Sequence, residues 1–350
     1  MSDATAATTG DQAGTAPRRP TLTVPTGAAH ARLLSVASYR PERVGYNDEL
    51  VEAIDSSDQW IRERSGIVSR RFARPDESVT DMAEAASRVA VERAGISFAD
   101  VDAVLVATVT HPYQTPSSAS LLAHRLGATP AAALDISAAC AGFCYGIALA
   151  ADMIRGGSAR HVLVVGVEKL SDFIDFSDRS SAFIFGDGAG AVVVGPSDTP
   201  AIGPTVWGSD GSQWDAIVNK SSWVEYRDQD LEWPALKMAG QTVFRWAVWQ
   251  MSPVAQKALE AAGLSAADLD AFIPHQANVR IIDAMVKQMA LPEHVAVARD
   301  IAHSGNTSAA SVPLAMDRML DEGTAARGGL ALLIGFGAGL TYAAQVVELP

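Results

Sequence analysis

The feature that most constrains the fold of this chain is an internal repeat. Residues 94–105, AGISFADVDAVL, match residues 262–273, AGLSAADLDAFI, at seven of twelve positions. Two later features recur in the same order: an Asp-Ile pair, at 135–136 and 300–301, and the apolar runs HVLVVG and LALLIG. Similarity at a fixed long spacing is typical of a fold built from two related halves. Convergence of helix–turn–strand units accounts for one such match, but three in order favour a duplication.

Each half alternates predicted helices with short apolar strands. Runs such as DAVLVATVT, AVVVG and LALLIGFG are typical of buried strands, and residues 78–95 and 241–263 have the apolar spacing of amphipathic helices. This alternation predicts an α/β fold with mixed or parallel sheets covered by helices. The polar segment 208–236 contains several Trp and Tyr residues and is predicted to be a long surface loop near a site.

Composition predicts where the chain divides and which classes of partner it disfavours. We expect a tail over 1–30, a first half over 31–199 and a second half over 200–350, with the divide at the Pro- and Gly-rich GPSDTPAIGP. With 27 Lys and Arg against 40 Asp and Glu, the net charge is −13, which argues against nucleic acid or an anionic membrane as the main partner.

The tail has no apolar signal region, and no run is long enough to span a membrane, so we expect a cytoplasmic protein. The two cysteines lie one helical turn apart, which excludes a disulfide framework and favours a reducing compartment. No group of His, Cys and carboxylate residues has metal-ligand spacing, so we predict no metal.

Cys140 is the first candidate for chemistry. It stands where an apolar strand containing Asp135 turns through small residues into a predicted helix. A cysteine at a helix start faces free backbone N–H groups and the positive end of the helix dipole, so we expect its thiol pKa to be lowered. A small buried side chain is the alternative for Cys140, and core packing is the interpretation for Cys144.

Two residues of the second half are further candidates. His275 follows an apolar strand in DAFIPHQANVR, the place where α/β sheets present side chains to ligands. Asn306 lies in SGNTSAAS, at a predicted helix start, and the repeat places it beside the position equivalent to Cys140. A hydrogen-bonded structural His and an ordinary helix N-cap are the alternatives. The repeat favours one cavity that Cys140 and Asn306 share.

Four motifs now stand in one order: DISAACAGF, PHQANVRII, SGNTSAAS and GFGAGLTYA. Together they resemble the β-ketoacyl-acyl-carrier-protein synthase III family of the thiolase superfamily, from about residue 31 to the C-terminus. The resemblance implies a thiolase fold, a five-layered αβαβα sandwich of two duplicated halves, in a homodimer. It also implies a catalytic triad of Cys140, His275 and Asn306, with the backbone N–H groups of Cys140 and Ala338 as an oxyanion hole. Many relatives have Gly at the position of Ala338, and a positive φ there strains Ala.

The implied reaction is a decarboxylating Claisen condensation that initiates fatty acid or polyketide synthesis. Cys140 takes the acyl group of a short acyl-CoA, which is a substrate and not a cofactor. Malonyl-acyl-carrier-protein then loses carbon dioxide, and His275 and Asn306 stabilise the resulting enolate. The product is a 3-oxoacyl-acyl-carrier-protein. An acyltransferase on the same scaffold, which passes the acyl group to a hydroxyl or amine without decarboxylation, is the alternative.

The resemblance also assigns the coenzyme A site. It implies that Trp60 and Arg179 hold the adenine between them, that Arg64 helps with phosphate, and that Gln241 lies near the pantetheine arm, where relatives often have Asn. Without the family, Trp60 and Arg64 are an i, i+4 pair on an exposed helix.

Four further positions concern partners and substrate size. Arg245, Arg280 and Lys287 match basic positions that contact the acidic carrier protein in this family. Solvated surface charges are the alternative. Thr115 stands where some acetyl-preferring relatives have Phe, at the end of an acyl pocket shared across the dimer. Its smaller side chain implies that branched or four-to-six-carbon starters are accepted. The alternative is an extended residue before Pro116 with no ligand contact.

Overall fold

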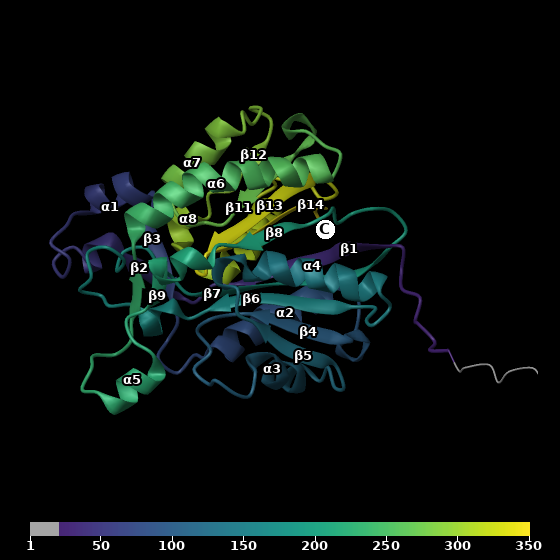
Figure 1. The fold of residues 1–350 in the computed structure, drawn as a ribbon, viewed down its shortest axis with the longest axis horizontal. Coiled ribbons are helices and arrows are strands. Elements are labelled where there is room, and N and C mark those ends of the chain that lie inside the picture. Colours follow the sequence, from purple (N-terminus) through teal and green to yellow (C-terminus); the bar gives the residue numbers. More distant parts are fainter. Residues whose placement is uncertain (1–20) are drawn as a thin grey trace, which may run out of the picture.

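The computed structural model describes residues 21–350, and two five-stranded sheets form its framework (Figure 1). The strands of the first sheet, in spatial order, are β1 (His30–Tyr39), β7 (Gly188–Ser197), β6 (Val162–Glu168), β4 (Ala103–Ala107) and β5 (Ala132–Ile136). Those of the second are β8 (Val206–Ser209), β14 (Thr341–Glu348), β13 (Leu330–Gly337), β11 (Ala271–Pro274) and β12 (Ala296–Val297). In this order each strand pair has the same parallel or antiparallel sense in both sheets.

Nine α-helices lie within the described residues. They are α1 (Asp58–Ser65), α2 (Val79–Ala94), α3 (Ser118–Leu126), α4 (Gly142–Arg155), α5 (Trp223–Asp228), α6 (Gly240–Ala261), α7 (Val279–Gln288), α8 (Ile301–Ser304) and α9 (Ser311–Asp321). The predicted helices over 78–95 and 241–263 correspond to α2 and α6. No helix within residues 21–350 is both long and apolar enough to cross a membrane.

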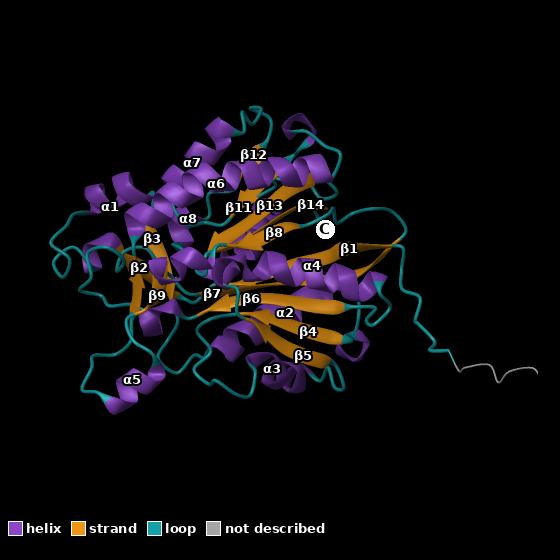
Figure 2. Ribbon diagram, in the orientation of Figure 1, coloured by secondary structure: helices purple, strands orange, loops and turns teal. Residues whose placement is uncertain are grey.

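The elements form five layers, which Figure 2 shows as alternating helices and strands. One apolar core joins α2 and α3 to the outer face of the first sheet. A second core joins α4 and α9 to the inner faces of both sheets, and a third joins α6 and α7 to the outer face of the second. The predicted αβαβα thiolase sandwich is therefore the observed fold.

The repeated residues recur because they do the same structural work in both halves. Gly95 ends α2 in the left-handed conformation, at φ 68°, and Gly263 follows α6 at φ 71°. Ser97 and Ser265 each begin a short 3-10 helix with a reciprocal capping box. Asp102 accepts the backbone N–H of His161, just before β6, and its counterpart Asp270 accepts that of Leu330, the first residue of β13. A match at these positions thus reports a shared backbone.

Shorter elements cover one end of the sandwich. β2 (Arg43–Tyr46) pairs with β3 (Ser69–Phe72), and β9 (Ile217–Asn219) pairs with β10 (Leu236–Met238). The segment 208–236, predicted as a loop, contains β9, α5 and the 3-10 helix η5 (Gly211–Ala216). The predicted tail over 1–30 lies mostly outside the described residues, and 21–29 have no regular secondary structure.

Candidate active site

Two short 3-10 helices, η3 (Ala139–Ala141) and η7 (Ser308–Ala310), meet at the centre of the molecule. η3 leads into α4 and η7 leads into α9, so the repeat brings the two helix starts together as the sequence predicts. Ala139 and Ser308 occupy equivalent places and both have positive φ, 45° and 48°. In the first half, the residue that follows this unusual backbone is Cys140.

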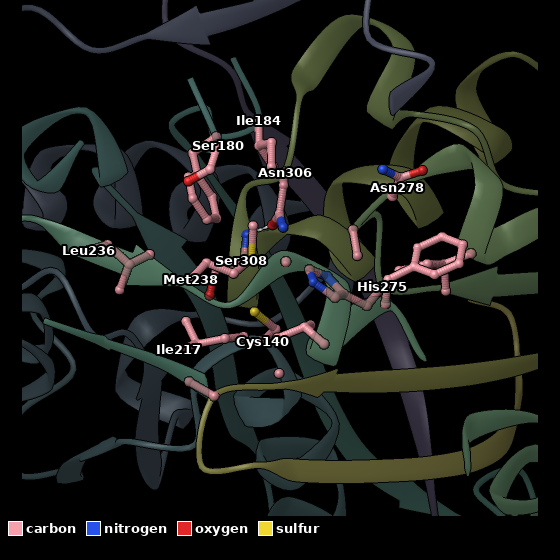
Figure 3. Close-up of a pocket in the computed structure, with 18 of the residues that line it drawn as sticks. Cys140, Ser180, Ile184, Ile217, Leu236, Met238, His275, Asn278, Asn306 and Ser308 are labelled. Atoms are coloured by element: carbon pink, nitrogen blue, oxygen red, sulfur yellow. Dashed lines mark hydrogen bonds between the residues drawn. The ribbon is translucent and has the colours of Figure 1, made fainter. Parts of the chain in front are cut away.

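A cavity of about 620 Å³ opens over η3. Cys140, His275 and Asn306 all line it, and Figure 3 shows their side chains around one space. Cys140 is half-buried, whereas His275 and Asn306 are buried. Cys144 is fully buried in the central core, which confirms its predicted packing role.

The Cys140 sulfur is shielded from solvent by the residues packed around it. Burial raises the pKa of its thiol to about 12, and the charge of Glu168 also raises it, while Ser308 and the backbone N–H groups of Cys140 and Ala338 lower it. The prediction of a lowered thiol pKa is wrong, because desolvation outweighs the donors at the helix start. A nucleophilic role for this sulfur therefore requires a group that takes its proton.

His275 is held by its neighbours from two sides. Its Nδ1 lies 2.7 Å from Ser311 Oγ, and its ring meets Phe336 edge to face at 5.3 Å. Ser311 Oγ also accepts the backbone N–H of Gln276. Burial lowers the pKa of His275 to about 3, so the imidazole is neutral at physiological pH. With Nδ1 engaged, Nε2 is the nitrogen available to the cavity.

Asn306 is oriented by the next turn of the chain. Its Oδ1 accepts the backbone N–H of Ser308 at 2.8 Å, a bond drawn in Figure 3. This bond engages the carbonyl end of the amide, so the Nδ2 group is free to act as a donor in the cavity. Asn306 also forms an isolated bridge with Phe185, which fixes its backbone against the first half.

Ala338 lies in the same wall. Ala338 does not have a positive φ, so its backbone does not need a glycine. The non-glycine residues that do have one, among those described, are Asp55, Ala139, Ala290 and Ser308. The preceding glycine is required by close approach: a Cβ at Gly337 would stand 2.7 Å from Cys140 Sγ. The motif GFGAGLTYA therefore brings the backbone of β13 close to the candidate nucleophile.

The outer part of the cavity contains the residues predicted to bind coenzyme A. The guanidinium groups of Arg179 and Arg64 lie 5.2 and 5.5 Å from the centroid of the Trp60 ring. Trp60 also packs edge to face on Phe183. An adenine between Trp60 and Arg179 therefore needs the guanidinium to move away from the ring. Gln241 lies on the same rim, at the start of α6.

The remaining predicted residues divide between the rim and the surface. Arg245 and Arg280 line the cavity, and Arg280 stacks on Phe244 at 5.3 Å. Lys287 is exposed near the end of α7 and does not line it. Thr115 is exposed in the loop between β4 and α3 and is likewise outside the lining. Within residues 21–350, no group of three or more His, Cys, Asp or Glu side chains is placed to hold a metal.

The structure adds site residues that the sequence analysis did not single out. Apolar side chains from β9 and β10 cover the cavity, namely Ile217, Leu236 and Met238. Ser308 lines it two residues after Asn306, within a motif already noted. Glu168 lies behind Ser308, fully buried. In the sequence, Glu168 stands out as a charged residue at the end of the otherwise apolar run HVLVVGVE. Glutamate is rarely fully buried unless it is paired, so a glutamate in a buried strand indicates a special role.

A duplicated thiolase fold with Cys, His and Asn side chains in one cavity defines the class: this chain is a condensing enzyme of the acyltransferase type. The family model for 3-oxoacyl-[acyl-carrier-protein] synthase III matches residues 134–211, and the model for its C-terminal part matches residues 259–349. The β-ketoacyl-[acyl-carrier-protein] synthase III of Streptomyces glaucescens is 59% identical over 325 residues, which cover 93% of this chain and 98% of that protein. The chain belongs to the β-ketoacyl-acyl-carrier-protein synthase III family.

Solved structures agree. The priming β-ketosynthase from the R1128 polyketide biosynthetic pathway is 52% identical and superimposes with a TM-score of 0.92, covering 95% of this chain and 99% of that one. The 3-oxoacyl-[acyl-carrier-protein] synthase III of Aquifex aeolicus is 38% identical with a TM-score of 0.84, covering 91% and 99%.

Proposed function

We propose that this chain condenses a short acyl-CoA with malonyl-acyl-carrier-protein and releases carbon dioxide, giving a 3-oxoacyl-acyl-carrier-protein that starts fatty acid or polyketide synthesis. The observation that carries the proposal is the convergence of Cys140, His275 and Asn306 on one cavity. A sulfur nucleophile and two neutral donors are the groups that acyl transfer followed by enolate formation requires.

In the first half-reaction, Cys140 Sγ attacks the thioester carbonyl and coenzyme A leaves. The tetrahedral oxyanion binds the backbone N–H groups of Cys140 and Ala338. Support comes from the position of these two groups, both of which lie close enough to lower the pKa of the thiol. Donors fixed in place before the reaction need no reorganisation when charge develops.

In the second half-reaction, malonyl-acyl-carrier-protein loses carbon dioxide and leaves an enolate. His275 Nε2–H and Asn306 Nδ2–H donate to the enolate oxygen, and the carbanion then attacks the acyl group on Cys140. The 2.7 Å contact between Ser311 Oγ and His275 Nδ1 is compatible with this tautomer, in which the hydroxyl donates to Nδ1 and its oxygen accepts the Gln276 N–H. A neutral imidazole with a pKa near 3 donates without carrying a buried charge.

Residues of the outer cavity recognise the substrates. Trp60, Arg64 and Arg179 bind the adenine and phosphates, and Gln241 contacts the pantetheine arm. Arg245 and Arg280 at the cavity and Lys287 on the exposed surface of α7 provide local positive charge for the acidic carrier protein, which a chain of net charge −13 needs. The active form is a homodimer in which Thr115 reaches the partner's acyl pocket, and its small side chain admits branched or four-to-six-carbon starters.

Mass spectrometry with product analysis tests this function. A panel of acetyl-, isobutyryl- and longer acyl-CoA substrates should each be tested for an acyl adduct on the intact protein. Adding malonyl-acyl-carrier-protein should then yield the 3-oxoacyl product and carbon dioxide. An adduct that transfers to a hydroxyl or amine acceptor with no carbon dioxide would instead identify the acyltransferase alternative.

A further inference from the structure

Glu168 is a fully buried carboxylate at the end of β6 whose two oxygens have different surroundings. Its Oε2 accepts three hydrogen bonds, from Thr108 Oγ1 at 3.1 Å, Thr110 Oγ1 at 2.7 Å and the Val109 backbone N–H at 3.0 Å. Its Oε1 accepts from Ser308 Oγ at 3.1 Å. No other donor reaches Oε1 among the described residues, so this oxygen has a lone pair available for a proton.

Ser308 connects this carboxylate to the candidate nucleophile. Its side chain lines the same cavity as Cys140, η7 packs against the η3 helix that contains Cys140, and its hydroxyl donates a hydrogen bond to Glu168 Oε1. The charge of Glu168 is also felt at the Cys140 sulfur, where it raises the thiol pKa. The hydrogen-bonded hydroxyl and carboxylate thus lie behind the wall of the cavity that contains the sulfur, where the two halves of the chain meet.

We propose that Glu168, acting through Ser308, is the group that accepts the proton of Cys140 when the sulfur attacks the acyl thioester. The S–H bond of Cys140 breaks and its proton passes to Ser308 Oγ, while the Ser308 hydroxyl proton passes to Glu168 Oε1. The sulfur electron pair forms the new bond to the acyl carbon, and the bond from that carbon to the coenzyme A sulfur breaks. The departing thiolate takes the proton back along the same path. This inference rests on Cys140 being the acylated residue.

His275 is a weaker candidate for this proton. It lies among buried groups, and with a pKa near 3 it would have to become a desolvated cation. Burial instead raises the pKa of Glu168 to about 7, so the carboxylate is the stronger base of the two. Transfer to Glu168 also leaves the charge of the site unchanged, because one buried anion replaces another, and this avoids a new desolvation cost.

The other titratable groups near β6 are engaged elsewhere. Neighbouring strands β4 and β7 contain none. Lys169 directs its Nζ to Pro75 O and Asp172. On α2, Asp81 pairs with Arg125 and Glu84 with Arg88, and on α4 Cys144 interacts with the Gly335 backbone. Asp187 bonds Ser171 and the Ala73 N–H. Among these groups, Cys140 is the one that lies in the same cavity lining as Ser308, the hydrogen-bond partner of Glu168.

Alkylation of Cys140 by iodoacetamide tests the path without any substrate. In the parent protein the rate should rise through an ionisation near the pKa of about 7 held by Glu168. In Glu168→Gln and in Ser308→Ala this step should disappear, with a rate lower by about 10²-fold at high pH, the size expected for loss of a general base. Asp187→Asn is the matched control, because Asp187 is also buried with a pKa raised to about 6 but has no bond to Ser308. Its profile should match the parent.

A second measurement separates this role from a structural one. Ser308 N–H holds Asn306, so a distorted site would also slow malonyl decarboxylation. In a Cys140→Ala background, Glu168→Gln should change decarboxylation by less than about twofold. An alkylation step near neutral pH that survives in both Glu168→Gln and Ser308→Ala overturns the proposal, as does an equal loss of decarboxylation. A parent protein that is alkylated as expected yet forms no acyl adduct contradicts the proposed function instead.

Discussion

The two helix starts at the centre of the molecule have the same backbone and different chemistry. Ala139 and Ser308 share a positive φ, and the residues that follow them, Cys140 and Ala309, are approached by equivalent glycines. A Cβ at Gly335 would stand 2.8 Å from the Cys140 carbonyl oxygen, and one at Gly166 would stand 2.2 Å from that of Ala309. The duplication therefore repeated the scaffold, including its strained turn.

What differs is the side chain that each half places against the other. The first half contributes the sulfur of Cys140, and β6 ends in Glu168 beside the second helix start. The second half contributes Ser308 and Asn306, and β13 ends in Gly337 beside the first. The proposed active site is therefore single, because only one turn carries a cysteine and only its counterpart lies beside Ser308 and Asn306.

The largest expected effect comes from moving the nucleophile between the halves. Cys140→Ala should abolish the acyl adduct, and adding Ala309→Cys should not restore it, because Ala309 is fully buried outside the cavity lining. Intact-mass measurement after incubation with acyl-CoA reports the adduct. Cys144→Ala is the control and should still acylate. Acylation of the relocated cysteine would show that the two turns are functionally interchangeable.

A smaller effect is expected at the residue two positions before each turn. Asn306→Ala should still acylate but should slow malonyl decarboxylation by about 10², or about 3 kcal/mol, because one oxyanion donor is lost. Ser137→Ala is the matched variant in the first half, where Ser137 is exposed, and it should leave decarboxylation unchanged. Carbon dioxide release measures both, and full activity in Asn306→Ala would remove this residue from the enolate site.

The glycine pair should separate function from stability. Gly337→Ala puts a Cβ against Cys140 Sγ. Overpacking costs about 1–3 kcal/mol, and here it displaces the reactive side chain. We therefore expect acylation to slow by about tenfold with little change in melting temperature. Gly166→Ala puts a Cβ against the Ala309 backbone and should lower the melting temperature instead. Equal effects of both variants on stability would contradict the asymmetry.

Substrate size tests whether the first half also determines the acyl pocket. Thr115→Phe should shift preference from isobutyryl-CoA towards acetyl-CoA, since a buried methylene is worth about 0.8 kcal/mol and the ring fills that space. The ratio of kcat/KM for the two substrates measures the shift. Because Thr115 is exposed in one chain, an unchanged ratio would mean that it does not line the partner's pocket.

The smallest expected effect concerns the pH dependence of the second half-reaction: the rate of malonyl decarboxylation should not change with pH. Decarboxylation by Cys140→Ala needs neutral His275, whose pKa is lowered by burial to about 3. The neutral form is complete well above that value, so the rate should stay level between about pH 5 and 8. A rate that falls with a midpoint near the ordinary His value would show that His275 is hydrated and not buried in the working enzyme.

Much of this architecture was predictable from local patterns. The capping residues Ser97 and Ser265 and the helix-ending Gly95 and Gly263 act within a few residues of themselves, so their repetition in the sequence reports the duplication directly. The segment 208–236 was harder, because its short elements depend on pairing with residues beyond its end, such as Leu236 to Met238 with Ile217 to Asn219.

The sequence by itself determined the fold, the family and the residue types that converge on the cavity, since each is encoded in short motifs. Only the tertiary structure decided the burial of the thiol and the surroundings on which the proposed path for its proton rests. Cys140, Glu168 and Ser308 come from three distant segments, and the link between them exists only where those segments pack. Desolvation has the same origin: a helix start favours thiolate locally, but the water that the folded core excludes sets the pKa of Cys140.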